Sequence, residues 1–385
     1  MAIEGRSETR SGRIKLGMVG GGNDAFIGGV HRIASRIDDH FELVAGALSS
    51  TPEKARASGE ALGLPRIYDD FKAMAMREAR LKDGIEAVAI VTPNHVHYAA
   101  AREFLKRGIH VICDKPLTST LADAKKLVAA VEKSDALFVL THNYTGYPMV
   151  RQAREMVASG DLGTIRVVQV EYPQDWLSVE QDIKQAEWRT DPERSGAGGS
   201  TGDIGTHAYN LACFVTGLEA ESLAADLQAF VPGRRVDDNA HVLMRFKGGA
   251  RGMLWSSQVA PGNENALRLR VYGEKGGLSW AQEDPNYLWY TPFGEPKRLI
   301  TRGGAGSSAA AGRVSRIPPG HPEGYLEGFA NVYSEAARAI LAHRSAAAVE
   351  PEVTYPDVYD GLKGVEFVAA CVKSSERNAA WVSLS

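Results

Sequence analysis

The sequence of 385 residues has little cysteine, no long hydrophobic run and no excess of charge of one sign. Its three cysteines, Cys113, Cys213 and Cys371, are odd in number and far apart, which argues against a disulfide framework and a zinc site. The longest apolar stretches, such as residues 87–91, are much shorter than the roughly 20 residues of a membrane-spanning helix. With 44 Lys and Arg against 47 Asp and Glu, the net charge of −3 provides no basic surface for nucleic acid or an anionic membrane. We therefore expect a soluble protein that binds a small molecule and no metal.

The first residues carry neither the apolar core of a secretory signal nor the paired arginines of a twin-arginine signal, so we expect a cytoplasmic protein. Residues 3–6 read Ile-Glu-Gly-Arg, which is typical of a protease site that follows a purification tag. We therefore regard residues 1–12 as a tail or tag remnant.

Residues 13–145 alternate short β-branched runs with amphipathic stretches, a pattern typical of a parallel sheet with helices on both faces. Helix signals fall between the runs, since Thr51-Pro52 can open one helix and Thr120 another. The expected strands are residues 14–19, 43–48, 85–91, 109–112 and 137–140. The pattern predicts a doubly wound α/β domain over residues 13–145.

Beyond residue 145 the pattern changes to strands joined by glycine-bearing turns, with a few helices. Strands are expected at residues 165–171, 242–246, 253–257 and 267–272. Helices are expected at residues 148–159, 203–215, 323–341 and 358–374, and the low-complexity stretch 303–312 is expected to be a mobile loop. The pattern predicts a second, α+β domain over residues 146–385 with a mostly antiparallel open sheet.

A glycine-rich loop follows the first expected strand, where doubly wound sheets bind dinucleotides. Glycines there let the backbone approach a pyrophosphate, and the next helix offers free N–H groups, although a simple tight turn also uses glycine. Ala25 stands where the third glycine of G-x-G-x-x-G is expected and Gly28 comes three residues later, which indicates a short insertion. The residues expected at the cofactor are Gly20, Gly22, Asn23, Ala25, Phe26 and Ile27.

The second expected strand is not followed by the acidic residue that holds the ribose 2′-hydroxyl of NAD. Ser49 and Ser50 can hydrogen-bond a plain ribose, whereas Lys54 or Arg56 could meet the 2′-phosphate of NADP. The residues leave the choice between NAD and NADP open.

Three further segments place polar side chains where ligands of such a fold bind. A Thr-Pro-Asn turn at residues 92–94 follows one strand, and Lys115 follows the next. Asp203 and His207 are four residues apart after a glycine-rich loop, which puts them on one face of a helix. Taken singly, these features also fit a capped turn, a surface lysine and a local hydrogen bond.

Together the motifs resemble the Gfo/Idh/MocA family of NAD(P)-dependent oxidoreductases, over about residues 13–384. The segment VTPNHVHYAAAREFLKRGIHVICDKPL at 91–117 is similar to the family's T-P-N-x-x-H and E-K-P signatures, with Asp114 in place of the usual glutamate. The segment GGSTGDIGTHAYN at 198–210 is similar to its D-x-x-x-H helix. The resemblance implies an N-terminal Rossmann domain and a catalytic group of Lys115, Asp203 and His207. The further cofactor contacts expected are Thr92, Pro93, Asn94, His97, Asp114 and Lys115.

These residue types suit the oxidation of a secondary alcohol. The imidazole of His207 would take the hydroxyl proton while hydride leaves the same carbon for nicotinamide. Lys115 would stabilise the nascent alkoxide, and Asp203 would orient His207 or bind a neighbouring hydroxyl.

Other residues expected along the substrate cleft are Tyr144, Tyr147, Trp176, Trp188, Arg189 and His321. Aromatic faces and an arginine fork suit a polyhydroxylated ring, although Trp and Tyr are also common in cores. His321 stands in a segment that resembles one of a sugar and inositol dehydrogenase subgroup, and a surface histidine at a helix start is the alternative.

We predict an NAD(P)-dependent dehydrogenase that acts on a secondary hydroxyl of a sugar or cyclitol and, as the resemblance implies, forms a homodimer or homotetramer. One alternative is an NAD-dependent glycosidase that works by transient oxidation, which the missing export signal disfavours. The other is a noncatalytic dinucleotide-binding regulator, which Lys115, Asp203 and His207 disfavour.

Overall fold

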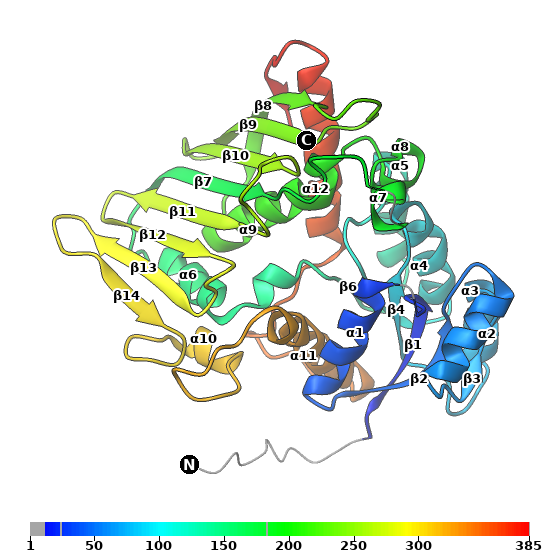
Figure 1. Cartoon of the computed structure of the whole chain (residues 1–385). Helices are drawn as coiled ribbons and strands as arrows, with labels where there is room; N and C mark the ends of the chain where they lie inside the picture. Colours follow the sequence, from blue (N-terminus) through cyan, green and yellow to red (C-terminus); the bar gives the residue numbers. More distant parts are fainter. Residues whose placement is uncertain (1–11, 24, 182–183, 385) are drawn as a thin grey trace.

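The computed structural model describes residues 12–23, 25–181 and 184–384, which form two β-sheets side by side (Figure 1). The first sheet has the order β3-β2-β1-β4-β5-β6, with every neighbouring pair parallel. Its strands are β1 Ile14–Gly20, β2 Phe41–Ala47, β3 Arg66–Ile67, β4 Ala87–Val91, β5 His110–Cys113 and β6 Phe138–Leu140. The strand order reverses between β1 and β4, so the carboxyl ends of these strands border the crevice where such sheets bind ligands. The predicted doubly wound sheet is confirmed.

Helices connect these strands. They are α1 Phe26–Ile37, α2 Pro52–Ala61, α3 Phe71–Glu78, α4 His97–Leu105 and α5 Leu121–Val131. The side chain of Thr120 caps α5 by accepting a hydrogen bond from the Asp123 amide, as the sequence indicates. Asn94 does not cap α4, whose N-cap is Val96; the Asn94 amide nitrogen donates to the Ser195 carbonyl at 2.9 Å. A 3₁₀ turn, η1 Asn94–Val96, therefore precedes α4.

The second sheet has the order β14-β13-β12-β11-β7-β10-β9-β8-β15. Its strands are β7 Ile165–Pro173, β8 Ala220–Gln228, β9 Asn239–Phe246, β10 Arg251–Ser257, β11 Arg268–Gly273, β12 Gly276–Ala281, β13 Tyr287–Pro292, β14 Arg298–Thr301 and β15 Val382–Ser383. All neighbouring pairs are antiparallel except β7 with β10. The predicted mostly antiparallel sheet is confirmed, although the sequence pattern indicated fewer strands.

Seven helices of the described chain beyond residue 145 pack around this sheet or between the two sheets. They are α6 Pro148–Ala158, α7 Lys184–Arg189, α8 Pro192–Ser195, α9 Thr206–Thr216, α10 Ala309–Arg313, α11 Tyr325–Arg344 and α12 Val358–Ser375. The expectation of a loop over residues 303–312 needs correction, because α10 begins within it. The Ser308 side chain caps that helix by accepting from the Ala311 amide. No helix in the described ranges is long and apolar enough to cross a bilayer.

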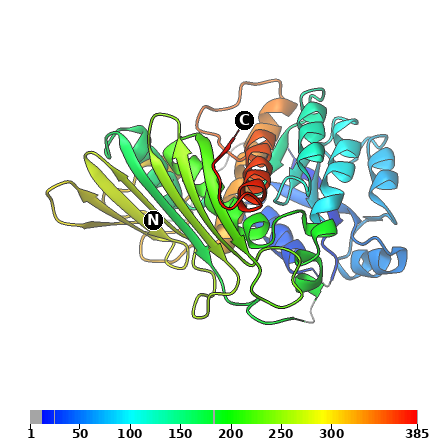
Figure 2. The same cartoon turned by 90° about the horizontal axis from the view of Figure 1, so that it is seen from above.

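Helices α11 and α12 join the two halves of the molecule. Phe329 and Tyr333 of α11 are buried with residues of β1, and α11 lies along α1. Figure 2 shows α12 between the two halves, with Val365 in the core of the first sheet and Phe367 in that of the second. The domain division at residues 145 and 146 stays a prediction: α11 packs into a core of the first sheet, and α12 contributes to the cores of both sheets.

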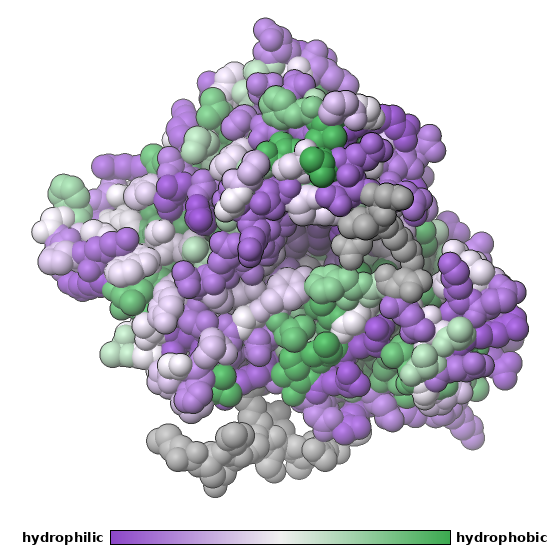
Figure 3. All heavy atoms as spheres, in the orientation of Figure 1, coloured by the Kyte–Doolittle hydropathy of each residue, from purple (hydrophilic) through white to green (hydrophobic). Residues whose placement is uncertain are grey.

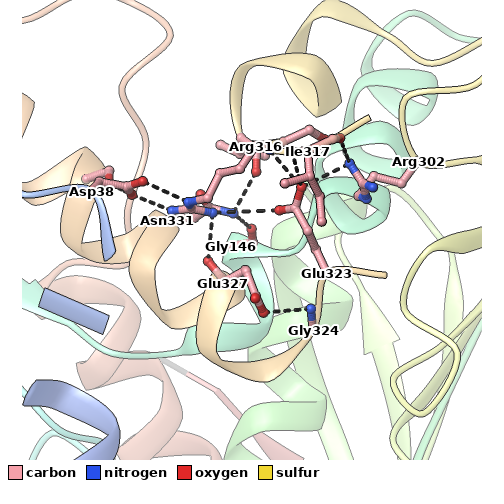
Figure 4. A network of polar contacts seen from close by, with 12 residues as sticks. Asp38, Gly146, Arg302, Arg316, Ile317, Glu323, Gly324, Glu327 and Asn331 are labelled. Carbon is pink, nitrogen blue, oxygen red and sulfur yellow. Dashed lines mark hydrogen bonds and ion pairs between the residues drawn. The ribbon is translucent and has the colours of Figure 1, made fainter. Parts of the chain in front are cut away.

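A buried polar network holds the chain that leads into α11 (Figure 4). Glu323 is 1% exposed at its side chain and forms an ion pair of 2.9 Å with Arg302, which is 2% exposed. The Glu323 carboxylate also accepts from the backbone amide of Arg316 at 2.7 Å. The Arg316 side chain in turn donates to Asp38 at the end of α1 at 2.8 Å. The network thereby ties α1 to the start of α11.

We expect Glu323→Gln to lower the free energy of unfolding by about 3 kcal/mol, because it leaves the buried Arg302 charge without its counter-ion. Glu219→Gln is the matched control: it breaks an exposed, solvent-screened pair with Lys247, so little or no loss is expected. Urea unfolding followed by tryptophan fluorescence measures both. Equal, small losses in the two variants would show that the buried pair does not stabilise the fold.

Candidate active site

A cavity of about 1050 Å³ lies between the two halves of the molecule. The carboxyl ends of β1, β2, β4 and β5 form one wall, and residues of β7, α7 and α9 form the other. Apolar side chains gather over α1 on the face shown in Figure 3. Phe26, the first residue of α1, is exposed and lines the cavity. The cavity occupies the ligand position expected for a doubly wound sheet.

The glycine loop forms a cradle of bare backbone at one end of this cavity. Gly20 and Gly21 have φ of 78° and 71°, values that favour glycine. A Cβ on Gly28 of α1 would lie 2.4 Å from the Gly21 carbonyl oxygen, so Gly28 takes the close-packing role of the third glycine. The late position of Gly28 is thus accommodated by the longer loop. This cradle fits a dinucleotide pyrophosphate, whose phosphates would meet the N-terminus of α1.

All six loop residues predicted at the cofactor line the cavity, namely Gly20, Gly22, Asn23, Ala25, Phe26 and Ile27. Gly21 lines it as well and was not among the predicted residues. The G-x-G pattern leaves its middle position unspecified, so the motif does not point to Gly21.

At the end of β2, Ser49, Ser50 and Lys54 line the cavity as predicted. Arg56 does not: its guanidinium makes two hydrogen bonds of 3.1 Å to Asp69. Asp69 and its neighbour Asp70, which precede α3, do line this part of the cavity. No acidic residue follows β2 directly, but two acidic side chains reach this part of the cavity from the segment that follows β3.

Thr92, Pro93 and Asn94 line the cavity at the end of β4, whereas His97 lies behind the wall. His97 is fully buried, with Nδ1 2.8 Å from the Pro116 carbonyl oxygen and Nε2 2.9 Å from that of Thr92. Burial lowers the pKa of His97. The predicted cofactor contact at His97 needs correction, because this side chain instead links the two turns that carry cavity residues.

Asp114 lines the cavity after β5 and accepts a hydrogen bond of 2.9 Å from the Thr141 hydroxyl. His31 Nε2 lies 3.8 Å from the same carboxylate oxygen, which is an electrostatic contact rather than a hydrogen bond. Burial raises the pKa of Asp114, but His31 and Lys115 outweigh it and lower the pKa to about 2. Asp114 is therefore ionised at neutral pH.

Lys115 and Asp203 meet across the cavity from opposite halves of the molecule. The Lys115 ammonium donates to the Asp203 backbone carbonyl at 2.6 Å and to its carboxylate at 2.9 Å. The other carboxylate oxygen accepts from Arg189 at 3.1 Å and from Gln258 at 3.0 Å. Burial raises the pKa of Asp203, but the charges of Lys115 and Arg189 outweigh it and hold the pKa well below its usual range. Ionised Asp203 thus fixes Lys115.

The glycine-rich loop before Asp203 is shaped by Asp237, which the sequence analysis missed. The buried Asp237 carboxylate accepts from the backbone amides of Gly199 at 2.7 Å and Thr201 at 2.8 Å. A Cβ on Gly199 would lie 2.0 Å from the Asp237 carbonyl oxygen, so glycine is needed there. The turn continues as a π-helix, η3 Thr201–Gly205, which presents Asp203 to Lys115.

His207 lines the cavity in the first turn of α9 and is largely buried. Its Nδ1 lies 3.5 Å from Nδ1 of His142, and its ring packs edge-on against Tyr144. Burial, followed by the charge of Lys115 and the neighbouring His142, holds the pKa of His207 well below its usual value. The carboxylate hydrogen bonds of Asp203 go to other groups, so the expected orientation of His207 by Asp203 needs correction.

Four of the predicted substrate-cleft side chains line the cavity, namely Tyr144, Trp176, Trp188 and Arg189. Tyr147 does not, because it is buried against Trp280 in the core of the second sheet. His321 does not reach the cavity either: its side chain is exposed, while Arg302 binds its backbone carbonyl. The turn at 318–321 is thus held through its backbone.

Polar residues from several strands complete this wall and were not predicted. The Tyr172 hydroxyl donates to the side-chain amide oxygen of Asn265 at 2.7 Å, and the Gln174 side chain donates to the same atom at 2.7 Å. Further lining residues absent from the prediction are Asn143, Glu264, Gln282 and Tyr325. They come from distant strands and loops and carry no shared local motif, so spacing in the sequence could not identify them. Within the described part of the chain, no group of three or more His, Cys, Asp or Glu side chains is arranged to hold a metal ion.

The two halves of the chain match models of one enzyme family. Residues 14–142 match the model of an oxidoreductase family with an NAD-binding Rossmann fold. Residues 150–279 match the model of the GFO/IDH/MocA C-terminal domain. The protein is therefore an oxidoreductase with an NAD-binding Rossmann domain. It belongs to the Gfo/Idh/MocA family, as its motifs indicate.

Similar proteins extend over nearly the whole chain. The uncharacterized oxidoreductase YfiI of Bacillus subtilis (strain 168) is 34% identical over 378 residues, which cover 96% of each chain. The crystal structure of an oxidoreductase from Sinorhizobium meliloti is 71% identical, with a TM-score of 0.90 over 96% of this chain and 99% of that one. An inositol dehydrogenase homolog from Azotobacter vinelandii, complexed with NADH and myo-inositol, is 36% identical, with a TM-score of 0.91 over 97% and 98% of the two chains.

We expect Gly28→Ala to raise the dissociation constant of NAD at least about tenfold, a loss of about 1.4 kcal/mol. The new methyl group would meet the backbone of Gly21 and push the loop out of its cradle shape. Gly29→Ala is the matched control, since a Cβ there has only the end of the Arg32 side chain nearby, at 3.9 Å. Isothermal titration calorimetry measures both, and native affinity in Gly28→Ala would contradict the role given to this loop.

Proposed function

We propose that this protein oxidises a secondary hydroxyl of a cyclic polyol, either a sugar or a cyclitol, with NAD as the hydride acceptor. The observation that carries the proposal is the convergence of Lys115, Asp203 and His207 in one cavity with the glycine cradle. The similarity to the Azotobacter vinelandii homolog, whose structure holds NADH and myo-inositol, supports a polyol substrate.

The wall beside the catalytic group suits a ligand with many hydroxyls. Gln174, Asn265 and Gln282 offer amide donors and acceptors, and Trp176 and Trp188 offer aromatic faces. Hydroxyl groups can exchange hydrogen bonds with the amides, while the apolar faces of a ring pack against the indoles. This combination favours a cyclic polyol over a purely apolar alcohol.

Residues of the chain itself can take up the proton that the substrate hydroxyl loses. Nicotinamide, when bound, supplies the hydride acceptor. His207 is neutral at neutral pH because its pKa is held low, so its Nε2, the nitrogen not facing His142, can accept the hydroxyl proton. The Lys115 ammonium, fixed by Asp203, lies in the same cavity and stabilises the alkoxide.

We expect self-association through the outer face of the second sheet. Leu243, Met253 and Trp289 are exposed there and lie in one row across the strands, as the register of the sheet shows. Leu243 and Met253 are neighbours at one end of this row and Trp289 lies near the other, with Gln169, Arg270 and Ser279 between them. Exposed apolar side chains that share one face of a sheet are typical of protein interfaces.

The test of the function is the formation of reduced nicotinamide, followed by its absorbance, with a panel of inositols, pyranoses and glycosides. We expect reduction with one class of polyol. His207→Ala should lower kcat by about 10²- to 10⁴-fold and leave NAD affinity unchanged. His321→Ala, whose exposed side chain lies outside the cavity, is the control and should match the native enzyme.

Other outcomes of this assay discriminate between the functions. Native turnover in His207→Ala would refute its role as the base. Sugar release from a glycoside without net reduction would replace the proposal by a glycosidase. Tightly bound cofactor without any turnover would replace it by a regulator.

We further propose that NAD is preferred over NADP because Asp69 acts in two ways. Its carboxylate lines the cavity and would repel a 2′-phosphate, and it pairs with Arg56, which could otherwise bind that phosphate. Lys54 lines the same region and would favour the phosphate, so Asp69 decides the balance.

Asp69→Asn should raise the ratio of kcat/KM for NADP to that for NAD about fivefold, the scale of a solvent-screened charge pair. Asp83→Asn removes the same charge from an exposed acid that pairs with Arg66 and lies outside the cavity, so it serves as the control. Steady-state kinetics with both cofactors gives the ratios. If Asp69→Asn changes the ratio no more than the control does, Asp69 does not select the cofactor.

A further inference from the structure

His142 lies behind His207, away from the cavity, and has no role in the mechanism above. It follows β6 and is 2% exposed. The two rings meet edge-on, with centroids 5.3 Å apart and an interplanar angle of 81°, and the two Nδ1 atoms are 3.5 Å apart. The neighbouring Thr141 hydroxyl is bound to Asp114, which fixes this segment beside the cavity.

Two facing nitrogens of neutral imidazoles require one donor and one acceptor, because each neutral ring carries a single N–H. Both rings are neutral at neutral pH: burial, with the charge of Lys115, lowers the pKa of His142 to about 3 and holds that of His207 well below its usual value. If His142 donates, His207 carries its proton on Nε2 and has no lone pair there for a substrate proton. If His207 donates, its Nε2 is free to act as a base.

Other groups near His207 are engaged elsewhere. The Asp203 carboxylate accepts from Lys115, Arg189 and Gln258. The hydroxyls of Tyr144 and Tyr172 bind each other, and Tyr172 also donates to Asn265. Within the described residues, Nδ1 of His207 has its hydrogen-bond contact with His142.

We propose that His142 accepts the Nδ1 proton of His207 and thereby holds the base in the tautomer whose Nε2 is unprotonated. His142 is thus a positioning residue, and the inference rests on the proposed role of His207 as the base. When His207 takes the substrate proton at Nε2, its Nδ1–H continues to donate to His142, which stabilises the imidazolium. Because His142 accepts this proton, the Asp203 carboxylate is not needed for His207 and can bind Lys115.

Nitrogen-15 NMR of histidine-labelled protein with NAD bound tests the tautomer directly. We expect Nδ1 of His207 to be protonated and Nε2 unprotonated in the native protein, with the opposite form gaining population in His142→Phe. The phenylalanine ring keeps the bulk of the imidazole but offers no acceptor. An Nε2–H form of His207 in the native protein would overturn the proposal, whether or not any polyol is oxidised.

Steady-state kinetics provides a second test of the proposal. His142→Phe should lower kcat by about 10- to 100-fold with little change in the KM for NAD, and His142→Asn, which keeps an acceptor oxygen, should restore much of this loss. His343→Phe is the control, because His343 meets His110 in a similar edge-on pair outside the cavity. Native kcat in His142→Phe would also overturn the proposal.

The two arms separate this inference from the proposed function. An absence of polyol oxidation by the native protein would contradict the function, whereas the NMR measurement would still decide the tautomer. If His142→Phe does not fold, the native spectrum and the His142→Asn variant decide the question.

Discussion

The ion pair between Lys115 and Asp203 is the interaction on which the arrangement of the site depends. Lys115 follows a strand of the first sheet and Asp203 lies in the helical turn beneath the second, so the pair bridges the two halves of the molecule at the cavity. Two largely buried charges lose hydration and need further hydrogen bonds in return. Arg189, Gln258 and the Asp203 backbone carbonyl supply them.

This pairing determines what Asp203 can do. A carboxylate whose oxygens already bind two cations and an amide has little capacity left to orient an imidazole. The sequence placed Asp203 and His207 on one helical face and suggested a direct contact, which is the usual expectation for residues four apart. The fold instead divides the roles, with Asp203 holding Lys115 and His142 meeting His207.

Local signals in the sequence predicted the parts of the structure that depend on local chemistry. The alternation of strands and helices and the glycine loop follow from periodicity and turn residues, whereas the roles proposed for Lys115, Asp203 and His207 come from the resemblance to the family. Residues 220–228 alternate little in polarity, and β8 was accordingly missed, since its pairing with β9 and β15 is a long-range property. Asp237 and His142 were missed for the same reason, because each acts on a residue more than 30 positions away.

The placement of a residue near a motif did not ensure that it reached the cavity. His97 belongs to the T-P-N-x-x-H signature, yet both its ring nitrogens face backbone carbonyls of cavity-lining turns. His321 stands beside turn formers, yet the buried Arg302 holds the backbone there and leaves the side chain outside. Sequence motifs of this kind record residues that shape the wall as well as residues that contact a ligand.

The positions of the charged and neutral side chains around Lys115, Asp203 and His207 indicate what kind of substrate the cavity can bind. Lys115 and Arg189 carry two positive charges, and the ionised Asp203 and Asp114 carry two negative ones. His142 and His207 are neutral because their pKa values are lowered. Charges around the centre thus compensate one another, and the amide-lined wall offers hydrogen bonds rather than a counter-ion. Such a site can bind a neutral polyol without leaving a charge unpaired, and in the proposed reaction the transient negative charge of the alkoxide would be met by the Lys115 ammonium that Asp203 already holds in place.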